Sequence, residues 1–298
     1  MNLAPVILFA YNRPGHLKKT LDALKNNLNA DKSVLYVFSD AAKSEKDKPL
    51  VYQVRSILKN IVGFKDIIIR LHEENLGLAA SVISGVTEVI KEHKKVIVLE
   101  DDLLTSHNFL CFMNQALDKY ESSKSIFSIS GYTLPIKMPK LSFDVFFSFR
   151  YSSWGWATWE DRWLKTDWEV KDFHELLNNK NLQSKLNRSG EDLLPMLKAQ
   201  QLNLNNSWAV RWAYTNAKND AYCVYPVISK VMNIGTDASG TNFTRSTTKY
   251  DVLIDEKANC TFTFSDEVQC NTQIEDAIKK IVKPSLLRKT INRFKLSI

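Results

Sequence analysis

Three consecutive acids, Glu100, Asp101 and Asp102, follow the apolar residues 96–99. A short apolar run suits a strand that is buried on both faces, so the acids come at its carboxyl end. Crowded carboxylates raise one another's pKa and repel unless a cation offsets them, and hard oxygen ligands suit Mg²⁺ or Mn²⁺. Ligands of open α/β sheets bind beyond the carboxyl ends of the strands, which predicts a cation that holds a phosphorylated ligand. The alternative is an acidic loop that caps a helix beginning near Ser106.

Alternating strand and helix patterns must position these acids. Buried-strand patterns occupy residues 5–10, 33–38, 66–71 and 125–130, besides the run before the acids. Helical patterns occupy residues 46–60, 78–92 and 107–120, and a further one follows Gly15. This alternation predicts an α/β fold with a wound, mostly parallel sheet, right-handed crossovers and flanking helices.

Polar side chains follow the first two predicted strands. Asn12 and Arg13 follow the first strand, and Asp40 follows the second. Arg13 is suited to a phosphate and Asp40 to a base or ribose, although Asp40 could equally be a turn aspartate. The first strand is followed by neither a dinucleotide-binding glycine motif nor a P-loop, which weakens dehydrogenase, NTPase and nucleotidyltransferase interpretations.

The densest aromatic patch lies between residues 151 and 168. Trp156, Trp159 and Trp163 fall at helical spacing, which predicts a buried core helix. Trp154 lies in a loop pattern before them, where an aromatic face could instead stack on a sugar. Farther on, residues 233–242 form a small-residue loop that could wrap a ligand as a lid or remain a surface loop.

The composition is that of an ordinary globular protein, with 298 residues, 44% of them hydrophobic and 24% charged. The first residues do not form a signal peptide and no transmembrane run is present, so we expect a cytoplasmic protein. Four scattered cysteines indicate neither a zinc site nor a disulfide framework, and reduced thiols are expected.

The formal charge of +7 is concentrated at the end of the sequence. Seven basic residues and no acids occur between Lys279 and Ile298, so the rest is near neutral and no nucleic-acid partner is expected. Residues 278–298 alternate apolar and basic groups, with one break at Pro284. This pattern suits an anionic membrane surface, and the alternative is a packed helix with a solvated basic face.

Five motifs in this order give the chain a resemblance to GT-A glycosyltransferases, specifically to the lineage of N-acetylglucosaminyltransferase I and its bacterial relatives. The resemblance covers residues 4–245. The motifs are residues 5–13, Ser39-Asp40, residues 98–102, residues 154–159, and residues 226–230 with the loop at 233–235. It implies a GT-A catalytic domain over 1–245, with a nucleotide-sugar half (1–130) and an acceptor half (131–245). Residues 246–298 would form an extension with the basic tail.

The resemblance also implies roles for particular residues. Asp102 would bind Mn²⁺ (or Mg²⁺), and Trp154 and Trp156 would contact the acceptor. The residues expected to bind a UDP-sugar are Tyr11, Asn12, Arg13, Asp40, Asn75, Glu100 and Asp101. The family's catalytic aspartate lies between two tryptophans, but the matching span, from Trp208 to Trp212, holds Ala209, Val210 and Arg211 instead. Arginine cannot serve as the base. The substitutes considered for the base are Glu160, Asp161 and Asp192.

The expected function is a metal-dependent, inverting transfer of a sugar from a UDP-sugar to a glycan or lipid-linked acceptor in bacterial surface polysaccharide synthesis, at the inner face of the cell membrane. Two alternatives remain open. One is a non-catalytic nucleotide-sugar or glycan-binding protein, which the missing aspartate suggests. The other is a sugar nucleotidyltransferase.

Overall fold

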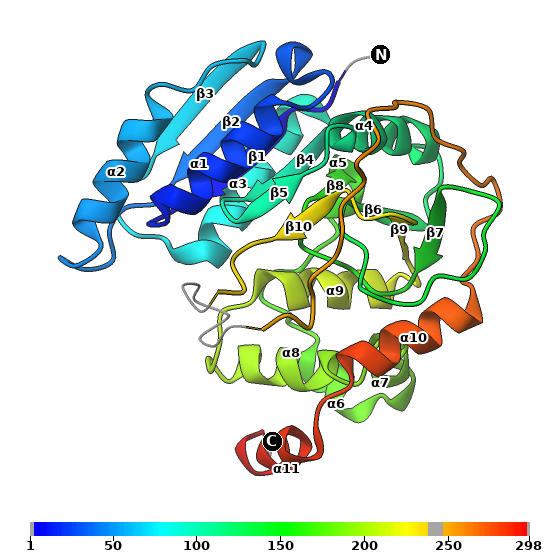
Figure 1. The fold of residues 1–298 in the computed structure, drawn as a ribbon. Coiled ribbons are helices and arrows are strands. Elements are labelled where there is room, and N and C mark those ends of the chain that lie inside the picture. The colour runs from blue at the N-terminus through cyan, green and yellow to red at the C-terminus, as the bar shows by residue number, and fades with distance from the viewer. Residues whose placement is uncertain (1–2, 238–246, 297–298) are drawn as a thin grey trace.

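The structure, a computed structural model, describes residues 3–237 and 247–296, without the side chains of residues 291, 293 and 294. Eight strands form one sheet in the order β3-β2-β1-β4-β8-β6-β9-β7 (Figure 1). The strands of this sheet are β1 (Val6–Ala10), β2 (Val34–Ser39), β3 (Asp66–Leu71), β4 (Lys95–Glu100), β6 (Ile126–Ser130), β7 (Val145–Ser148), β8 (Trp156–Trp159) and β9 (Tyr222–Pro226). A second, two-stranded sheet pairs β5 (Leu103–Thr105) with β10 (Val231–Asn233).

The strand directions confirm the predicted wound sheet in its first half. Strands β3, β2, β1 and β4 are parallel, and Leu8 in β1 lies opposite Val37 on one side and Leu99 on the other. The second half is mixed, because β8 runs antiparallel to both β4 and β6, and β7 runs antiparallel to β9. Six of the eight strands therefore point one way, and their carboxyl ends form one edge.

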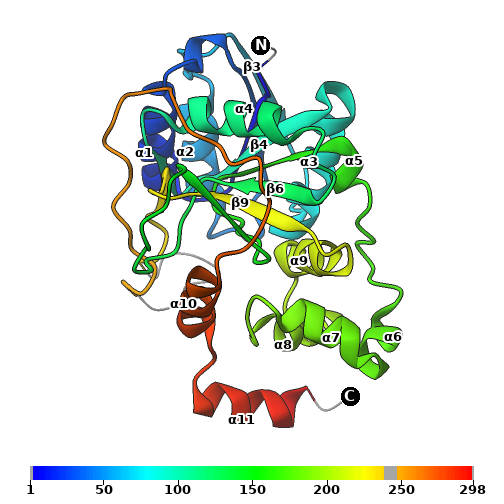
Figure 2. The ribbon, with the colours of Figure 1, turned by 90° about the vertical axis from the view of Figure 1, so that its right-hand side faces the viewer.

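Helices cover both faces of the sheet, so the fold has three layers. They are α1 (Pro14–Lys25), α2 (Lys48–Leu58), α3 (Gly77–His93), α4 (Phe109–Tyr120), α5 (Glu160–Trp163), α6 (Phe173–Asn178), α7 (Lys180–Asn187), α8 (Leu193–Gln201), α9 (Trp208–Lys218), α10 (Thr272–Val282) and α11 (Leu286–Lys295). Residues alternate between the faces: Val6 and Leu8 pack with α1, α2, α4 and α10, whereas Ile7 and Phe9 pack with α3 and α6–α9. Figure 2 shows α9 next to the sheet, with α7 and α8 outside it.

The tryptophan-rich segment differs from the helix that its spacing predicts. Residues Trp156–Trp159 form strand β8, and only the short helix α5 (Glu160–Trp163) follows it. The helical prediction was wrong for the strand because β8 fills the gap between β4 and β6, and the ladder hydrogen bonds outweigh a local pattern. The expectation of burial is correct, since Trp156, Trp159 and Trp163 are each at most 2% exposed.

Several residues between 250 and 282 pack against the same core. Residues 247–271 carry neither helix nor extended strand, apart from one bridge between Phe147 and Cys270. They lead into α10, whose Ile274 and Ile278 are fully buried. The predicted domain boundary near residue 245 falls among residues that are not described, as does the loop prediction for residues 238–242.

The expectation of four free thiols is wrong for two of the cysteines. Cys111 in α4 and Cys260 form a disulfide with a Cα–Cα separation of 5.4 Å. The bond joins residues 149 positions apart, so no short spacing in the sequence could announce it. Cys223 and Cys270 are free. The bond links the irregular segment 247–271 to helix α4, which packs on the sheet.

Candidate functional site

The acid triplet lies at the carboxyl edge of the parallel strands, between β4 and β5. The loop after β10 is held beside it, because β5 and β10 pair with Asn233 opposite Leu103. The backbone N–H of Ile234 then donates to the Asp102 carbonyl oxygen at 2.8 Å. Two motifs more than 130 residues apart in the sequence therefore meet at one spot, with Asp102 between them.

Arg13, at the end of β1, is bound to Asp102. Its Nη1 donates to Asp102 Oδ2 at 2.6 Å, and both side chains are about one-seventh exposed. Its Nη2 lies 3.5 Å from the Gly235 carbonyl oxygen and 3.6 Å from Asp237 Oδ1. His16 contacts the other oxygen of Asp237 at 3.1 Å. The loop after β10 is thus closed over the β1–α1 turn by charged contacts.

Gly235 makes room for this arrangement. A Cβ added there would lie 2.0 Å from Asp102 Oδ2 and 2.8 Å from Arg13 Nη1. Any side chain at this position would force the carboxylate and the guanidinium apart. The glycine in the predicted loop motif is therefore required by a close approach to Asp102, and it does not need an unusual backbone angle.

The other two acids differ in their contacts. Tyr11 N–H donates to Asp101 Oδ2 at 3.1 Å, and Thr20 Oγ1 donates to the Asp101 carbonyl at 2.9 Å, which ties the triplet to β1 and α1. No hydrogen bond reaches the Glu100 carboxylate from the described part of the chain. Burial raises the pKa of Glu100 to about 8 and that of Asp101 to about 7, and the charge of Asp102 adds to both shifts.

Asp40, at the end of β2, caps helix α3. Its Oδ1 accepts from the Leu76 N–H and its Oδ2 from the Gly77 N–H, each at 2.9 Å. Asn75 Nδ2 donates to the same carboxylate at 3.0 Å and also to the Ala41 carbonyl at 2.7 Å. An acid at a helix N-terminus satisfies free N–H groups and complements the helix dipole. Asp40 and Asn75, both predicted to bind the donor, therefore shape the loop between β3 and α3.

The remaining predicted donor-binding residues lie in the turn after β1. Tyr11 Oη accepts from the Lys43 N–H at 3.0 Å, and Asn12 Nδ2 donates to Asp47 Oδ1 at 2.9 Å. These contacts join the β1–α1 turn to the β2–α2 loop. The structure thus brings the turn, Asp40 and the triplet to one edge of the sheet, as their positions after successive strands predict.

The donor set fits a hard divalent cation that is shared with a ligand phosphate. Among the residues described, no three His, Cys, Asp or Glu side chains gather into a closed metal site. Mg²⁺ and similar ions are commonly held by one or two carboxylates plus substrate phosphates, so a complete protein cage is not required. Asp102 supplies a suitable oxygen, and that oxygen is bound to Arg13 here. A cation would have to replace that guanidinium contact.

Two of the predicted catalytic bases lie at the wrong edge. Glu160 and Asp161 follow β8, which runs antiparallel to β4, and Trp159 lies opposite Lys95 at the amino end of β4. About five residues of extended strand, roughly 16 Å, separate that end from the triplet. Glu160 pairs with Lys94, and Asp161 pairs with Lys124 and Arg162. Both assignments are corrected, because the antiparallel direction of β8 cannot be read from spacing.

The third predicted base, Asp192, is fully engaged. Its two oxygens accept from Arg150 Nη1 and Nη2 at 3.0 and 2.8 Å. Such a bidentate pair leaves the carboxylate with little freedom to take a proton from a substrate. Arg211, which lies between Trp208 and Trp212, donates to the Trp168 carbonyl at 2.9 Å and to Asn206 Oδ1 at 3.1 Å. It thereby holds the start of α9 against the segment at Trp168.

The two predicted acceptor tryptophans have different surroundings. Trp156 is 1% exposed and stacks on Trp208 with ring centroids 5.2 Å apart, so its assignment to the acceptor site was wrong. Trp156 is part of the buried aromatic core that also contains Trp163, Trp208 and Trp212. Trp154 is only partly buried and meets Tyr132 edge-on at 4.5 Å and Tyr250 at 5.9 Å. Trp154 therefore keeps a position from which a ring could contact a ligand.

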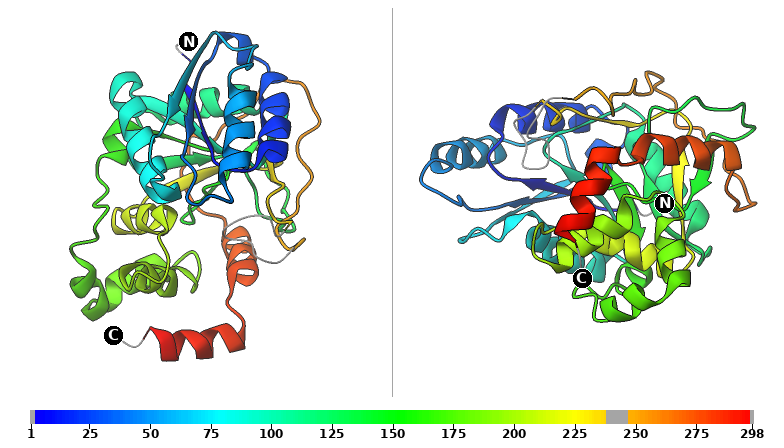
Figure 3. Two further views of the ribbon diagram at one scale, coloured as in Figure 1. Left: turned by 90° about the vertical axis from the view of Figure 1, so that its left-hand side faces the viewer. Right: turned by 90° about the horizontal axis from the view of Figure 1, so that it is seen from below.

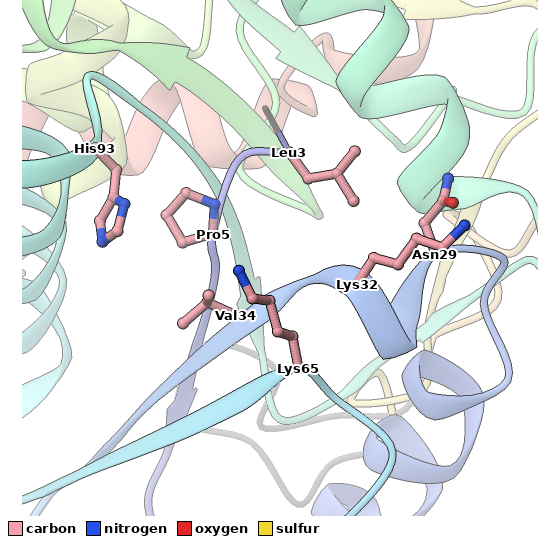
Figure 4. Close-up of a pocket in the computed structure, with 7 residues that line it drawn as sticks. All are labelled: Leu3, Pro5, Asn29, Lys32, Val34, Lys65 and His93. Atoms are coloured by element: carbon pink, nitrogen blue, oxygen red, sulfur yellow. The ribbon is translucent and has the colours of Figure 1, made fainter. Parts of the chain in front are cut away.

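A separate surface hollow lies at the opposite edge of the sheet. Figure 4 shows Pro5, Val34, Lys65 and His93, which come from the amino ends of β1, β2 and β3 and from the end of α3, around this hollow. Leu3, Asn29 and Lys32 complete it. It is separated from the triplet by the length of the strands and does not belong to the candidate site.

Sequence reasoning missed several members of the site. His16, Thr20 and Asp237 contact the triplet or its partners, but no spacing connects them to it. Gly235 and Asp237 both lie in the loop 233–242 that the sequence did single out. The contacts of all four depend on the pairing of β5 with β10 and on where α1 packs, which local patterns do not specify.

The chain matches no model of a known protein family. Among solved structures, it is similar to S. aureus TarS residues 1–349, with 12% identity and a TM-score of 0.37 over 52% of this chain and 47% of that one. It is also similar to the mannosyltransferase PcManGT from Pyrobaculum calidifontis, solved with GDP-Man and Mn²⁺. The identity is 13% and the TM-score 0.34, over 54% of this chain and 48% of that one. Mouse xyloside xylosyltransferase 1 is a third such structure, with 10% identity and a TM-score of 0.36 over 72% of this chain and 80% of that one. The chain thus spans about half the length of the first two.

These likenesses concern the arrangement of an α/β fold and are too distant to carry a functional argument. The chain has the mixed, largely parallel sheet with flanking helices that the sequence predicts. No helix in the described ranges is long and apolar enough to cross a membrane. The function is therefore argued from the candidate site itself.

Proposed function

We propose that this chain is a glycosyltransferase that uses a nucleotide-sugar donor, a UDP-sugar in the first instance. The observation that carries the proposal is the 2.6 Å contact between Arg13 and Asp102 at the carboxyl edge of the sheet. Gly235 lies directly against this pair. It combines a cation for a diphosphate with a carboxylate for a divalent metal at the place where α/β sheets bind ligands. The motif resemblance to GT-A enzymes supports the same assignment.

The residues of the chain divide the work in this proposal. Arg13 would bind the diphosphate through its guanidinium, and Asp102 would hold Mn²⁺ or Mg²⁺. The bound metal supplies positive charge at the leaving diphosphate. Asp101, tied to Tyr11, and Glu100 face the donor, and Asp40 and Asn75 fix the loop that borders the nucleotide. In this proposal, the loop at Gly235 and Asp237 excludes water from the anomeric carbon of the donor sugar.

The acceptor in this proposal is a glycan or a lipid-linked sugar, and the setting is bacterial surface polysaccharide synthesis at the inner face of the membrane. Partly buried Trp154, with Tyr132 and Tyr250 edge-on to it, supports an acceptor that offers a sugar face. Aromatic rings of this kind combine a large apolar face with defined orientation. Inversion at the anomeric carbon follows from the resemblance alone and is part of the proposal.

A donor screen tests the function directly. The full chain is incubated with UDP- and GDP-sugars, with and without Mn²⁺, and thermal shift and nucleotide release are measured. We expect stabilisation and slow release of UDP from one UDP-sugar, both dependent on metal. If no nucleotide-sugar raises the melting temperature in the presence of Mn²⁺, the proposal is wrong.

A second candidate is a non-catalytic nucleotide-sugar-binding protein. Two observations favour it: the span from Trp208 to Trp212, where the resembled family has its catalytic aspartate, holds no carboxylate, and both oxygens of Asp192 are bound by Arg150. Calorimetric binding of a donor without UDP release on addition of acceptor extracts would support this candidate. A nucleotidyltransferase, the remaining alternative, would join UTP to a sugar phosphate and release pyrophosphate from the UTP.

A further inference from the structure

Helix α11 presents two apolar side chains to solvent. Leu286 is 84% exposed and Leu287 is 71% exposed, whereas Leu296 just beyond the helix is buried. Two adjacent leucines at a helix start form a continuous apolar spot. Single exposed leucines are ordinary, whereas two neighbouring leucines among basic side chains have the composition of a helix that lies in a membrane interface.

The helix is fixed in place although its leucines face outward. Ser285 Oγ caps its start by accepting the Arg288 N–H at 3.2 Å. Lys289 forms an ion pair with Glu191, which precedes α8. The buried Leu296 anchors the other end. The ion pair of Lys289 with Glu191 and the buried Leu296 therefore connect α11 to the rest of the protein.

The charged residues of α11 itself are all basic, and Glu191, from the segment before α8, pairs with one of them, Lys289. Lys283, Arg288 and Lys295 are exposed, and no acid occurs after Asp276 in the sequence. An anionic partner with an apolar phase complements these exposed bases and leucines. A second copy of α11 would bring the same bases face to face, and charge repulsion opposes that pairing.

The position of α11 suits a flat, extended partner. It lies at the end of the molecule farthest from the amino terminus, as both side views show (Figures 2 and 3). Seen from below, α11 stands in front of the other elements (Figure 3, right). The carboxyl ends of β1 and β2, which precede Arg13 and Asp40, also point away from that terminus (Figure 1).

We propose that α11 docks the protein on an anionic lipid bilayer. Leu286 and Leu287 enter the boundary between headgroups and acyl chains, while Lys283, Arg288 and Lys295 contact headgroup phosphates. A bilayer with anionic lipids offers the apolar phase and the negative charge together, as interfacial basic helices require. This inference does not rest on the glycosyltransferase assignment. If both hold, the acceptor is presented at the membrane surface.

Vesicle sedimentation with the full chain tests the docking. We expect binding to vesicles rich in phosphatidylglycerol, little binding to pure phosphatidylcholine, and release as salt screens the charges. The double substitution Leu286→Ser with Leu287→Ser should lower the partition coefficient about tenfold or more, because the buried apolar groups are lost. Lys283→Gln with Arg288→Gln should weaken binding and flatten its salt dependence.

The matched control is Val62→Ser. Val62 is 61% exposed and precedes β3, so it lies at the opposite edge of the sheet. This variant should bind vesicles like the unchanged protein. Circular dichroism and the melting temperature verify that each variant is folded, which is expected because the replaced side chains are exposed.

Three outcomes overturn the docking proposal. They are unchanged partitioning of the double leucine variant, equal binding to both kinds of vesicle, and a dimer in solution that the leucine substitutions abolish. Release of UDP from a donor in solution is measured on the same variants. It should be unaffected by the α11 substitutions, so failure of the docking and failure of the proposed activity give different results.

Discussion

Arg13 and Asp102, 89 positions apart in the sequence, form an ion pair of 2.6 Å between the carboxyl ends of β1 and β4. Each side chain is about 13–14% exposed, so the pair is largely withdrawn from water. The guanidinium of Arg13 neutralises the charge of one carboxylate, Asp102, in the triplet of acids. A diphosphate with its metal offers a second way to meet the same charges, because the phosphates attract Arg13 and the cation attracts Asp102.

This competition makes Arg13→Met informative. Removing the guanidinium leaves Asp102 without its cation, so the free energy of unfolding without metal should fall by about 3 kcal/mol. Mn²⁺ alone should bind more tightly, since Asp102 is no longer occupied, whereas UDP should bind more weakly. Calorimetry with Mn²⁺ and UDP separately would reveal the opposite signs. Equal weakening of both would contradict a competition at Asp102.

Asp102→Asn should abolish metal-dependent turnover, with a loss of about a thousandfold or more, and should leave the fold intact. The amide keeps the size of the side chain but loses the charge that holds a hard cation. UDP release with and without Mn²⁺ measures the effect. Glu160→Gln is the control, because Glu160 lies at the other end of the strands and pairs with an exposed lysine. Full activity of Asp102→Asn would remove the metal-dependent mechanism.

Asp40→Asn tests the capping role of that carboxylate. Asp40 accepts from the N–H groups of Leu76 and Gly77, and an amide nitrogen cannot accept at one of the two. We expect a loss of about 2 kcal/mol in the free energy of unfolding, measured by urea titration. Asp66→Asn, on an exposed aspartate at the start of β3, should change stability little. A donor affinity that falls while stability stays unchanged would assign Asp40 to direct nucleotide contact instead.

The stability of the metal-free protein should fall as pH rises between about 4 and 8. Burial raises the pKa of Glu100 from 4.5 to about 8 and that of Asp101 from 3.8 to about 7. The folded state therefore binds more protons than the unfolded state in this window, and raising the pH favours unfolding. Urea titrations at several pH values, with a chelator present, measure the slope.

The substitution Glu100→Gln should flatten that slope, because it removes one of the two groups with a raised pKa. Mn²⁺ with UDP should do the same in the unchanged protein, since the added positive charge favours the ionised acids. A metal-free stability that does not decline over the window would contradict the crowding of the triplet.

Cys260→Ser should lower the free energy of unfolding by about 2–4 kcal/mol under non-reducing conditions. The disulfide with Cys111 closes a loop of 149 residues, so its loss frees the unfolded chain. A reductant should have the same effect on the unchanged protein and none on the variant. Cys270→Ser, which replaces a free thiol, is the control. Mass spectrometry without reduction would contradict the bond if Cys111 and Cys260 were found as thiols.

The sequence alone determined the parallel half of the sheet and the edge where the candidate site lies. Apolar runs that end in polar residues, such as Val98 and Leu99 before Glu100, specify a buried strand and a charged terminus at once. Because parallel strands share a carboxyl edge, Arg13, Asp40 and Asp102 had to lie along the same edge of the sheet.

Tertiary structure alone decided what each carboxylate could contact. Glu160 and Asp161 are local neighbours of an aromatic patch, but the reversed direction of β8 carries them to the far edge. The pairing of β5 with β10 brings Gly235 to Asp102, and α3 captures Asp40. Hydrogen bonds between strands and the packing of helices depend on partners far along the chain. A local pattern of residue types therefore fixes where a strand ends but not which groups meet its end.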